Sequence, residues 1–245
     1  MNYPLEAFDR ISIINLPSRL DRRCETAAEL TRIGLSFEDS RVDLFPAFRP
    51  SDKGEFTSIG ARGCFLSHLR VLQRAVDDGI HRLLILEDDV SFSKMFILHP
   101  EAVINSLSSP DWAIFYGGHK IIPPLPATPR AGLVQVHPTV AVQTTHCIAF
   151  QGGAIRKAAD FLSAMARRQG GDVLGGPMHV DGAYSWFRVA NPDLVTLAAN
   201  PPCCFQRSSA TNIHALPWFD RVALIRQVVS HLRRIKNRYA FGRRS

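Results

Sequence analysis

The 245-residue sequence has no apolar run of about 18 residues and no cysteine pair with Cys-x-x-Cys spacing. The first absence predicts that no helix of this sequence spans a membrane. The five cysteines are odd in number and scattered, which argues against a disulfide framework or a zinc ribbon and for a reducing compartment. Residues 1–10 also lack the apolar segment of a signal peptide, so we expect a cytoplasmic protein.

Acidic residues are absent after Asp220, where eight basic residues follow. The whole chain has 29 basic and 22 acidic residues, a net charge of +7, so the first 220 residues carry 21 basic and 22 acidic groups. A nucleic-acid-binding protein would usually spread positive charge over its folded domain. We therefore expect no nucleic-acid partner. A hydrophobic content of 46% in a chain of this length predicts a folded domain with a sizeable core.

Strands and helices are predicted to alternate along the chain. Short apolar and β-branched runs predict strands at 10–16, 41–46, 82–89, 112–116, 144–151 and 194–198. Apolar stripes with three- and four-residue spacing predict helices at 20–33, 59–78, 94–107, 153–168 and 219–239. We expect Gly117-Gly118 to end a strand and the proline-rich segment 121–138 to be mostly loop. This order predicts an α/β domain with a central, mostly parallel sheet.

Three consecutive acidic residues, Glu87, Asp88 and Asp89, directly follow the most apolar predicted strand. In open α/β sheets, ligands bind beyond the carboxyl ends of the strands. Grouped carboxylates repel one another unless a cation or hydrogen-bond donors offset them, and Mg²⁺ and Mn²⁺ prefer carboxylates together with substrate phosphates. Because side chains alternate along a strand, Glu87 and Asp89 are expected to share a face, opposite Asp88. The alternative is that the three residues only cap a strand and begin a loop.

Three segments, taken together, resemble glycosyltransferase family 25, which includes bacterial lipooligosaccharide glycosyltransferases and collagen galactosyltransferases. They are Ile14-Asn15-Leu16 followed by Arg19, Asp21, Arg22 and Arg23; Gly63-Cys64-Phe65-Leu66-Ser67-His68; and Ile85-Leu86-Glu87-Asp88-Asp89-Val90. The resemblance spans about residues 10–215, in the same order and spacing as in the family. Each segment alone would be weak support.

The resemblance implies a nucleotide-sugar-binding, Rossmann-like domain of the GT-A type over residues 1–216. It implies inverting transfer of a hexose, such as galactose, from a UDP-sugar to a cell-surface glycan such as lipooligosaccharide. A divalent metal, Mn²⁺ or Mg²⁺, is implied as cofactor. The residues implied to bind the donor are Asn15, Leu16, Arg19, Arg22, Ser67, Glu87 and Asp88. Those implied to bind the metal are Glu87, Asp89 and His214, and those implied in catalysis are Asp181, Asp89 and His68.

Physical chemistry supports several of these roles. Guanidinium groups and backbone amides recognise diphosphate well, which suits the arginines after Asn15. Asp181 lies beside the glycine-rich segment 170–176, and inverting transfer needs one general base near the acceptor hydroxyl. Simpler interpretations stay open. Asp181 would also suit the N-terminus of a helix at 183–187, and His68 would suit a satisfied core position.

Asn212 stands where the family often has an aspartate in a Ser-Asp-Ile-like element. Asparagine cannot act as a base and is a weaker metal ligand. This departure motivates a second hypothesis, that the chain is a non-catalytic protein that binds a sugar nucleotide or a membrane.

The basic segment 217–245 has apolar residues at three- and four-residue spacing, with arginines over much of the remainder. Such a pattern is typical of an amphipathic helix on an anionic membrane surface. This predicts peripheral attachment to the inner face of the cytoplasmic membrane. The alternative is a terminal helix that packs on the body of the protein.

Overall fold

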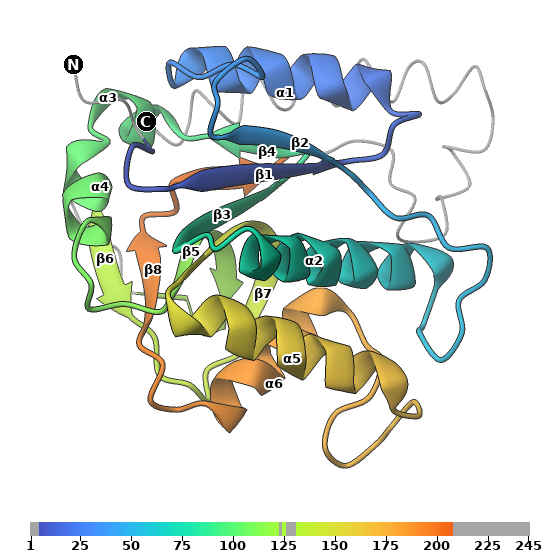
Figure 1. Cartoon of the computed structure of the whole chain (residues 1–245). Coiled ribbons are helices and arrows are strands. Elements are labelled where there is room, and N and C mark those ends of the chain that lie inside the picture. Colours follow the sequence, from blue (N-terminus) through green and yellow to red (C-terminus); the bar gives the residue numbers. More distant parts are fainter. Residues whose placement is uncertain (1–4, 123, 126–130, 208–245) are drawn as a thin grey trace.

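The computed structural model describes residues 5–122, 124–125 and 131–207, which form an α/β fold (Figure 1). Its strands are β1 Arg10–Asn15, β2 Val42–Pro46, β3 Arg82–Glu87, β4 Val90–Phe92, β5 Ile114–Ile121, β6 Gly132–Gln135, β7 Val142–Gln151, β8 Thr196–Asn200 and β9 Cys204–Gln206. Its helices are α1 Leu20–Arg32, α2 Ile59–Asp77, α3 Lys94–Leu98, α4 Glu101–Leu107, α5 Gly153–Arg167 and α6 Val180–Ala190. Among the described residues, no helix is long and apolar enough to cross a bilayer.

Seven strands form one mixed sheet in the order β2-β1-β3-β7-β5-β8-β6. β1 pairs in parallel with β2 and β3, and β5 pairs in parallel with β8. β7 lies antiparallel between β3 and β5, and β6 lies antiparallel at the edge beside β8. Five of the seven strands therefore run in one direction, which agrees with a mostly parallel sheet. β4 and β9 form a separate antiparallel pair.

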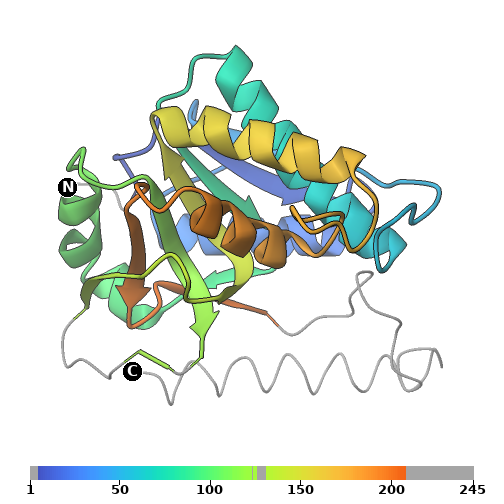
Figure 2. The same cartoon turned by 90° about the horizontal axis from the view of Figure 1, so that it is seen from below.

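Helices cover both faces of this sheet. α1, α3 and α4 lie over one face, and α2, α5 and α6 lie over the other (Figures 1 and 2). Consecutive residues of β3 show the two layers: Leu84 enters the core beside α4, whereas Ile85 enters the core beside α2 and α5. Both side chains are fully buried, as expected for a strand covered on both faces.

Several predicted boundaries were wrong. The helix expected over 94–107 is divided into α3 and α4, because Pro100 cannot continue a helix and instead precedes a new one. The last large-sheet strand, β8, begins two residues later than predicted. The proline-rich segment contains β6. Proline is tolerated beside such a strand because β6 lies at the edge of the sheet.

Gly117 and Gly118 do not end a strand, because β5 continues through both to Ile121. A Cβ atom at Gly118 would clash with the ring of His146 on the neighbouring strand. Glycine therefore serves close packing of β5 against β7 here, and register shifts accompany it.

The fold brings the carboxyl ends of β2, β1 and β3 together. The chain passes from β2 to β3 across β1, so the strand order reverses beside β1. Such a switch point is where ligands bind in open α/β sheets. His214, Asn212 and the predicted helix at 219–239 lie outside the described residues, as does the division at residue 217.

Candidate active site

A cavity of about 360 Å³ lies at this switch point. Its walls come from the end of β1, the start of α1, the loop 47–50 and the first half of α2. The predicted donor-site residues Leu16, Arg19, Arg22, Ser67, Glu87 and Asp88 all line it. Arg49, which the sequence did not single out, adds a third guanidinium group. A cavity with three guanidinium groups suits an anionic ligand such as a diphosphate.

The first half of α2 holds the loop 47–50 in place. The helix begins after Ser58, whose side chain accepts a hydrogen bond from the Ala61 amide. A Cβ atom at Gly63 would lie 2.7 Å from the Phe48 carbonyl oxygen, so only glycine lets the loop approach this closely. Four residues on, Ser67 Oγ accepts the Phe48 amide at 2.8 Å and donates to the Gly63 carbonyl. Ser67 is thus a positioning residue for the cavity wall.

Asp88 is held by side chains of β1 and α1. Arg22 Nη1 donates to Asp88 Oδ1 at 2.6 Å, and Asn15 Nδ2 donates to Asp88 Oδ2 at 2.8 Å. Thr26 Oγ1 donates to the Asp88 carbonyl oxygen at 2.9 Å. Asn15 therefore acts through Asp88, and its amide does not line the cavity. The sequence predicted the proximity of these residues but not this division of roles.

Asp89 is buried in the turn between β3 and β4. Its Oδ2 lies 3.7 Å from Arg22 Nη1 and accepts a hydrogen bond from Gln206 Nε2 at 3.1 Å. Burial, reinforced by the negative charge of Glu87, raises the pKa of Asp89 to about 7. Its Oδ1 is buried and has no hydrogen-bond partner among the described residues. This oxygen is suited to a cation or a substrate hydroxyl.

Glu87 contacts side chains of α2 and β7, whereas Asp88 contacts side chains of β1 and α1, as the alternation predicted. Asp89, which was predicted to share the face of Glu87, lies 3.7 Å from the same Arg22 Nη1 that binds Asp88, because it lies in the turn after β3 and not in the strand. Glu87 Oε1 accepts a hydrogen bond from Thr145 Oγ1 at 2.9 Å and lies 3.5 Å from Nε2 of His68. Burial alone would raise the pKa of Glu87, but attraction to His68, with help from Thr145, holds it below its ordinary value. Glu87 is thus a partly buried carboxylate at the end of a central strand.

A second cavity, of about 170 Å³, opens on the other side of Glu87. It is lined by Ala61, Cys64, Glu87, Thr144, Thr145, His179, Val180, Asp181 and Gln206. Cys64 and Glu87 line both cavities, so the two spaces meet at these side chains. Asp181 lies at the start of α6, where its Oδ1 accepts the Gly182 amide and its Oδ2 accepts the Thr144 amide at 3.4 Å. The structure therefore brings Asp181 and Glu87 to one cavity.

Thr144 has a backbone φ of +68°. This left-handed conformation is a true outlier for a β-branched residue and costs on the order of 1–3 kcal/mol. Thr144 lies in β7 beside the second cavity, and its Oγ1 is buried without a hydrogen-bond partner among the described residues. Strain of this kind is concentrated at functional sites.

The polar residues of β7 were missed by sequence analysis. Thr144, Thr145 and His146 are consecutive in a strand whose remaining described interior is largely apolar. Three adjacent polar side chains in such a strand are the signal that could have placed β7 in the site. Arg207 was also missed: its Nη2 donates to the Asp88 carbonyl at 2.7 Å, and its amide donates to the Asp89 carbonyl.

A divalent cation fits the chemistry of the acidic cluster. Glu87 is partly buried and Asp89 is buried, and Asp89 keeps an oxygen that no described donor satisfies. Arg22 already offsets part of the charge by contacting Asp88 and Asp89. The predicted third ligand, His214, lies outside the described residues.

Residues 8–121 match the family model described as "Glycosyltransferase family 25 (LPS biosynthesis protein)". Over these residues the chain is similar to glycosyltransferase family 25. The matched region contains β1, β3 and α2, and with them the acidic cluster and most of the first cavity. The family resemblance carried by the three sequence segments is thereby confirmed.

Curated relatives include members of glycosyltransferase family 25. The human "Inactive glycosyltransferase 25 family member 3" is 29% identical over 144 residues, which cover 51% of this chain and 24% of that protein. Human "Procollagen galactosyltransferase 2" is 29% identical over 131 residues, covering 46% of this chain and 21% of that protein. The chain thus spans about a quarter of the length of these relatives.

A solved structure is also similar to the chain. It is a glycosyltransferase involved in the glycosylation of the major capsid of PBCV-1, with a TM-score of 0.37 and 16% identity. The alignment covers 64% of this chain and 67% of that chain.

Proposed function

We propose that the protein is an active glycosyltransferase that moves a hexose, such as galactose, from a UDP-sugar to a glycan acceptor. The observation that carries this proposal is that two cavities meet at Glu87, one with three arginines and the other with Asp181. Transfer requires a donor and an acceptor hydroxyl to be held side by side. The family match over residues 8–121 supports the reaction class.

In this proposal the first cavity binds the nucleotide diphosphate. Arg19, Arg22 and Arg49 line it, and their positive charge offsets the charge of the phosphates. Glu87 and Asp89 would hold Mn²⁺ or Mg²⁺, which would supply further positive charge beside the leaving diphosphate. Asn15 and Thr26 keep Asp88 and its neighbours in position from behind the cavity.

Asp181 is the proposed general base in the second cavity. Its carboxylate is fixed by the Thr144 and Gly182 amides, which orient its oxygens without protonating them. In inverting transfer, the base accepts the proton of the acceptor hydroxyl as the oxygen attacks the anomeric carbon and the nucleotide diphosphate leaves. The acceptor we propose is a cell-surface glycan such as lipooligosaccharide, with the basic segment 217–245 near an anionic membrane.

The test measures binding and transfer separately. Thermal unfolding with UDP, with and without Mn²⁺, should show metal-dependent stabilisation, about 2.7 kcal/mol at a hundredfold excess over the dissociation constant. Arg49→Ala should weaken UDP binding, whereas Arg156→Ala, an exposed arginine on α5, should not. Asp181→Asn should keep UDP binding and lose at least 100-fold in transfer. Full transfer by Asp181→Asn would refute its role as base.

A second candidate function is a binding protein without catalysis, since a similar human protein is named inactive. It predicts the same stabilisation by UDP. It also predicts that no UDP-hexose releases UDP, either by hydrolysis or by transfer of its sugar to any of a panel of glycan acceptors. Detection of acceptor-dependent UDP release would decide for the enzyme.

A further inference from the structure

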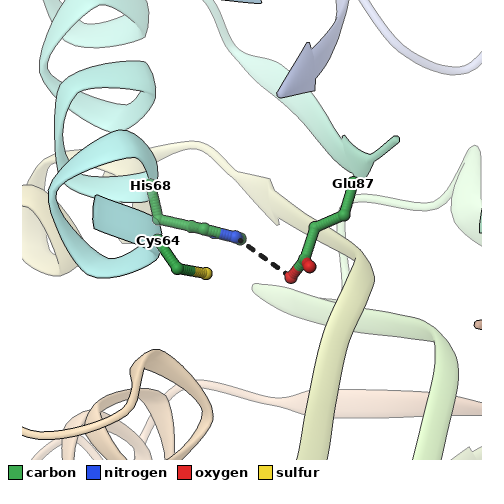
Figure 3. A group of neighbouring side chains, drawn as sticks. All are labelled: Cys64, His68 and Glu87. Atoms are coloured by element: carbon green, nitrogen blue, oxygen red, sulfur yellow. Dashed lines mark ion pairs between the residues drawn. The ribbon is translucent and has the colours of Figure 1, made fainter. Parts of the chain in front are cut away.

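Cys64 and His68 lie on the same face of α2 and both point toward Glu87 at the end of β3 (Figure 3). A four-residue spacing places two helical side chains one turn apart on one face. The Cys64 Sγ, one His68 ring nitrogen and one Glu87 carboxylate oxygen all lie within 4.8 Å of one another. Within the described part of the chain, this trio meets the geometric requirement for a metal site.

His68 shows why this trio differs from ordinary core packing. Its Nδ1 lies 3.2 Å from the hydroxyl of buried Tyr184, which fixes the ring orientation. Its Nε2 points toward Glu87 and is buried without a hydrogen-bond partner among the described residues. A metal-bound histidine commonly uses one nitrogen for the metal and the other for such an orienting contact. The Nε2 atom, which lies 3.5 Å from Glu87 Oε1 as an ion pair and makes no hydrogen bond with the described residues, is therefore the atom that would bind the metal.

The distance between His68 and Glu87 already suits two ligands of one ion, and Cys64 Sγ lies within 4.8 Å of both ligand atoms. His68 Nε2 and Glu87 Oε1 are 3.5 Å apart, close to the separation of about 3.3 Å between two ligands of a tetrahedral zinc ion. Thr145 donates to the same Glu87 oxygen and orients the carboxylate from the side of β7. Cys64 and Glu87 line both cavities, so an ion has a route in and a fourth position remains for water.

We propose that Cys64, His68 and Glu87 form a zinc site between the two cavities. Its chemistry differs from that of the carboxylate cluster proposed for Mn²⁺ or Mg²⁺, because thiolate and imidazole ligands select Zn²⁺ over harder cations. Cysteine binds zinc as a thiolate, so zinc must displace the Cys64 thiol proton. Glu87 is common to both sets, so zinc competes with Mn²⁺-dependent UDP binding; this consequence rests on the proposed function.

Cobalt is a direct probe of the site, because a cobalt–thiolate bond gives a charge-transfer absorption band that is independent of enzymatic activity. The full chain, kept reduced, is titrated with Co²⁺ and then with Zn²⁺. We expect a thiolate-to-cobalt band that saturates at one equivalent and that Zn²⁺ abolishes. Cys64→Ser should remove the band. Cys24→Ser, at an exposed cysteine on α1, should leave it unchanged.

His68→Asn and Glu87→Gln should each weaken cobalt binding at least tenfold, with circular dichroism used to verify that each variant is folded. Absence of the band in the unmodified chain, or a band that survives Cys64→Ser, overturns the proposal. UDP binding is measured separately. A cobalt band without UDP binding would support the zinc site and refute the proposed donor site. UDP binding without a cobalt band would support the proposed donor site and refute the zinc site.

Discussion

At the scale of single residues, glycine determines how closely β5 and β7 pack. A Cβ atom at Gly118 would clash with the His146 ring and would lie 2.9 Å from the Cys204 carbonyl oxygen. The backbone carbonyl cannot move aside as easily as a flexible side chain. A Cβ atom at Gly132 in β6 would have no described atom within 4 Å, which makes it a matched site in another strand of the same sheet.

We therefore expect Gly118→Ala to lower the free energy of unfolding by about 1–3 kcal/mol through overpacking. Gly132→Ala should change it by no more than about 0.5 kcal/mol. Urea unfolding followed by circular dichroism measures both. Equal effects in the two variants would show that the close contact at Gly118 is relieved at little cost.

His119 provides a second prediction at this scale. Its Nε2 donates to the Ala199 carbonyl oxygen at 2.8 Å, and its Nδ1 is buried without a partner among the described residues. Burial lowers the pKa of His119 below its ordinary value of 6.5. The unfolded chain thus takes up a proton that the folded chain resists, so stability is present above pH 6.5 and falls as pH drops below it.

Replacement of His119 by Gln should reduce this loss of stability between about pH 7 and pH 5. Urea midpoints measured at several pH values test it. Some pH dependence should remain, because burial also lowers the pKa of His146. An unchanged slope in His119→Gln would mean that other groups carry the whole effect.

At the scale of elements, α6 is tied to the sheet by one buried cation. Arg188 is fully buried and donates to the Val140 carbonyl at 2.8 Å, to the His137 carbonyl at 2.7 Å and to Thr196 Oγ1 at 3.1 Å. It thereby joins α6 to β8 and to the segment before β7. Asp181 begins the same helix, so this anchor also sets the position of the proposed base.

Arg188→Met should lower the free energy of unfolding by about 3 kcal/mol, because three oxygens lose the same buried donor at once. Arg156→Met, at an exposed position on α5, should change it by less than about 0.5 kcal/mol. Chemical denaturation of both variants provides the comparison. A small loss in Arg188→Met would indicate that water replaces the guanidinium group.

At the scale of the whole molecule, one sheet joins two separate hydrophobic layers. Ile13 of β1 packs in the layer of α1, α3 and α4, and Ile85 of β3 packs in the layer of α2, α5 and α6. Both side chains are completely buried. The backbone hydrogen bonds of the sheet connect the layers, so they should unfold together.

Ile13→Val and Ile85→Val should each cost about 0.5–1.5 kcal/mol. The double variant should lose the sum within about 0.5 kcal/mol, since the two side chains share no cavity. Fluorescence and circular dichroism should report one common transition in urea. Two separate transitions would show that the layers are independent units.

The local features of this protein could be predicted from its sequence. The apolar run of β3, the stripe of α2 and the family segments are contiguous in the chain, so their periodicity and order predicted the α/β class and the acidic cluster, and the family resemblance implied six residues of the first cavity. The sequence also predicted that Glu87 and Asp88 face opposite ways, because alternation along a strand is a local property.

Which distant residues meet depends on the folded arrangement and could not be predicted from the sequence. The antiparallel place of β7, the passage of β5 through Gly118 and the meeting of Thr145 with Glu87 depend on pairing between segments far apart in the sequence. The Asn15 side chain donates to Asp88 and does not line the cavity, and the Cys64 side chain lies beside those of His68 and Glu87. The packing of whole helices and strands fixes these side-chain orientations. Local periodicity contains no information about such pairings, which is why the second cavity could not be predicted.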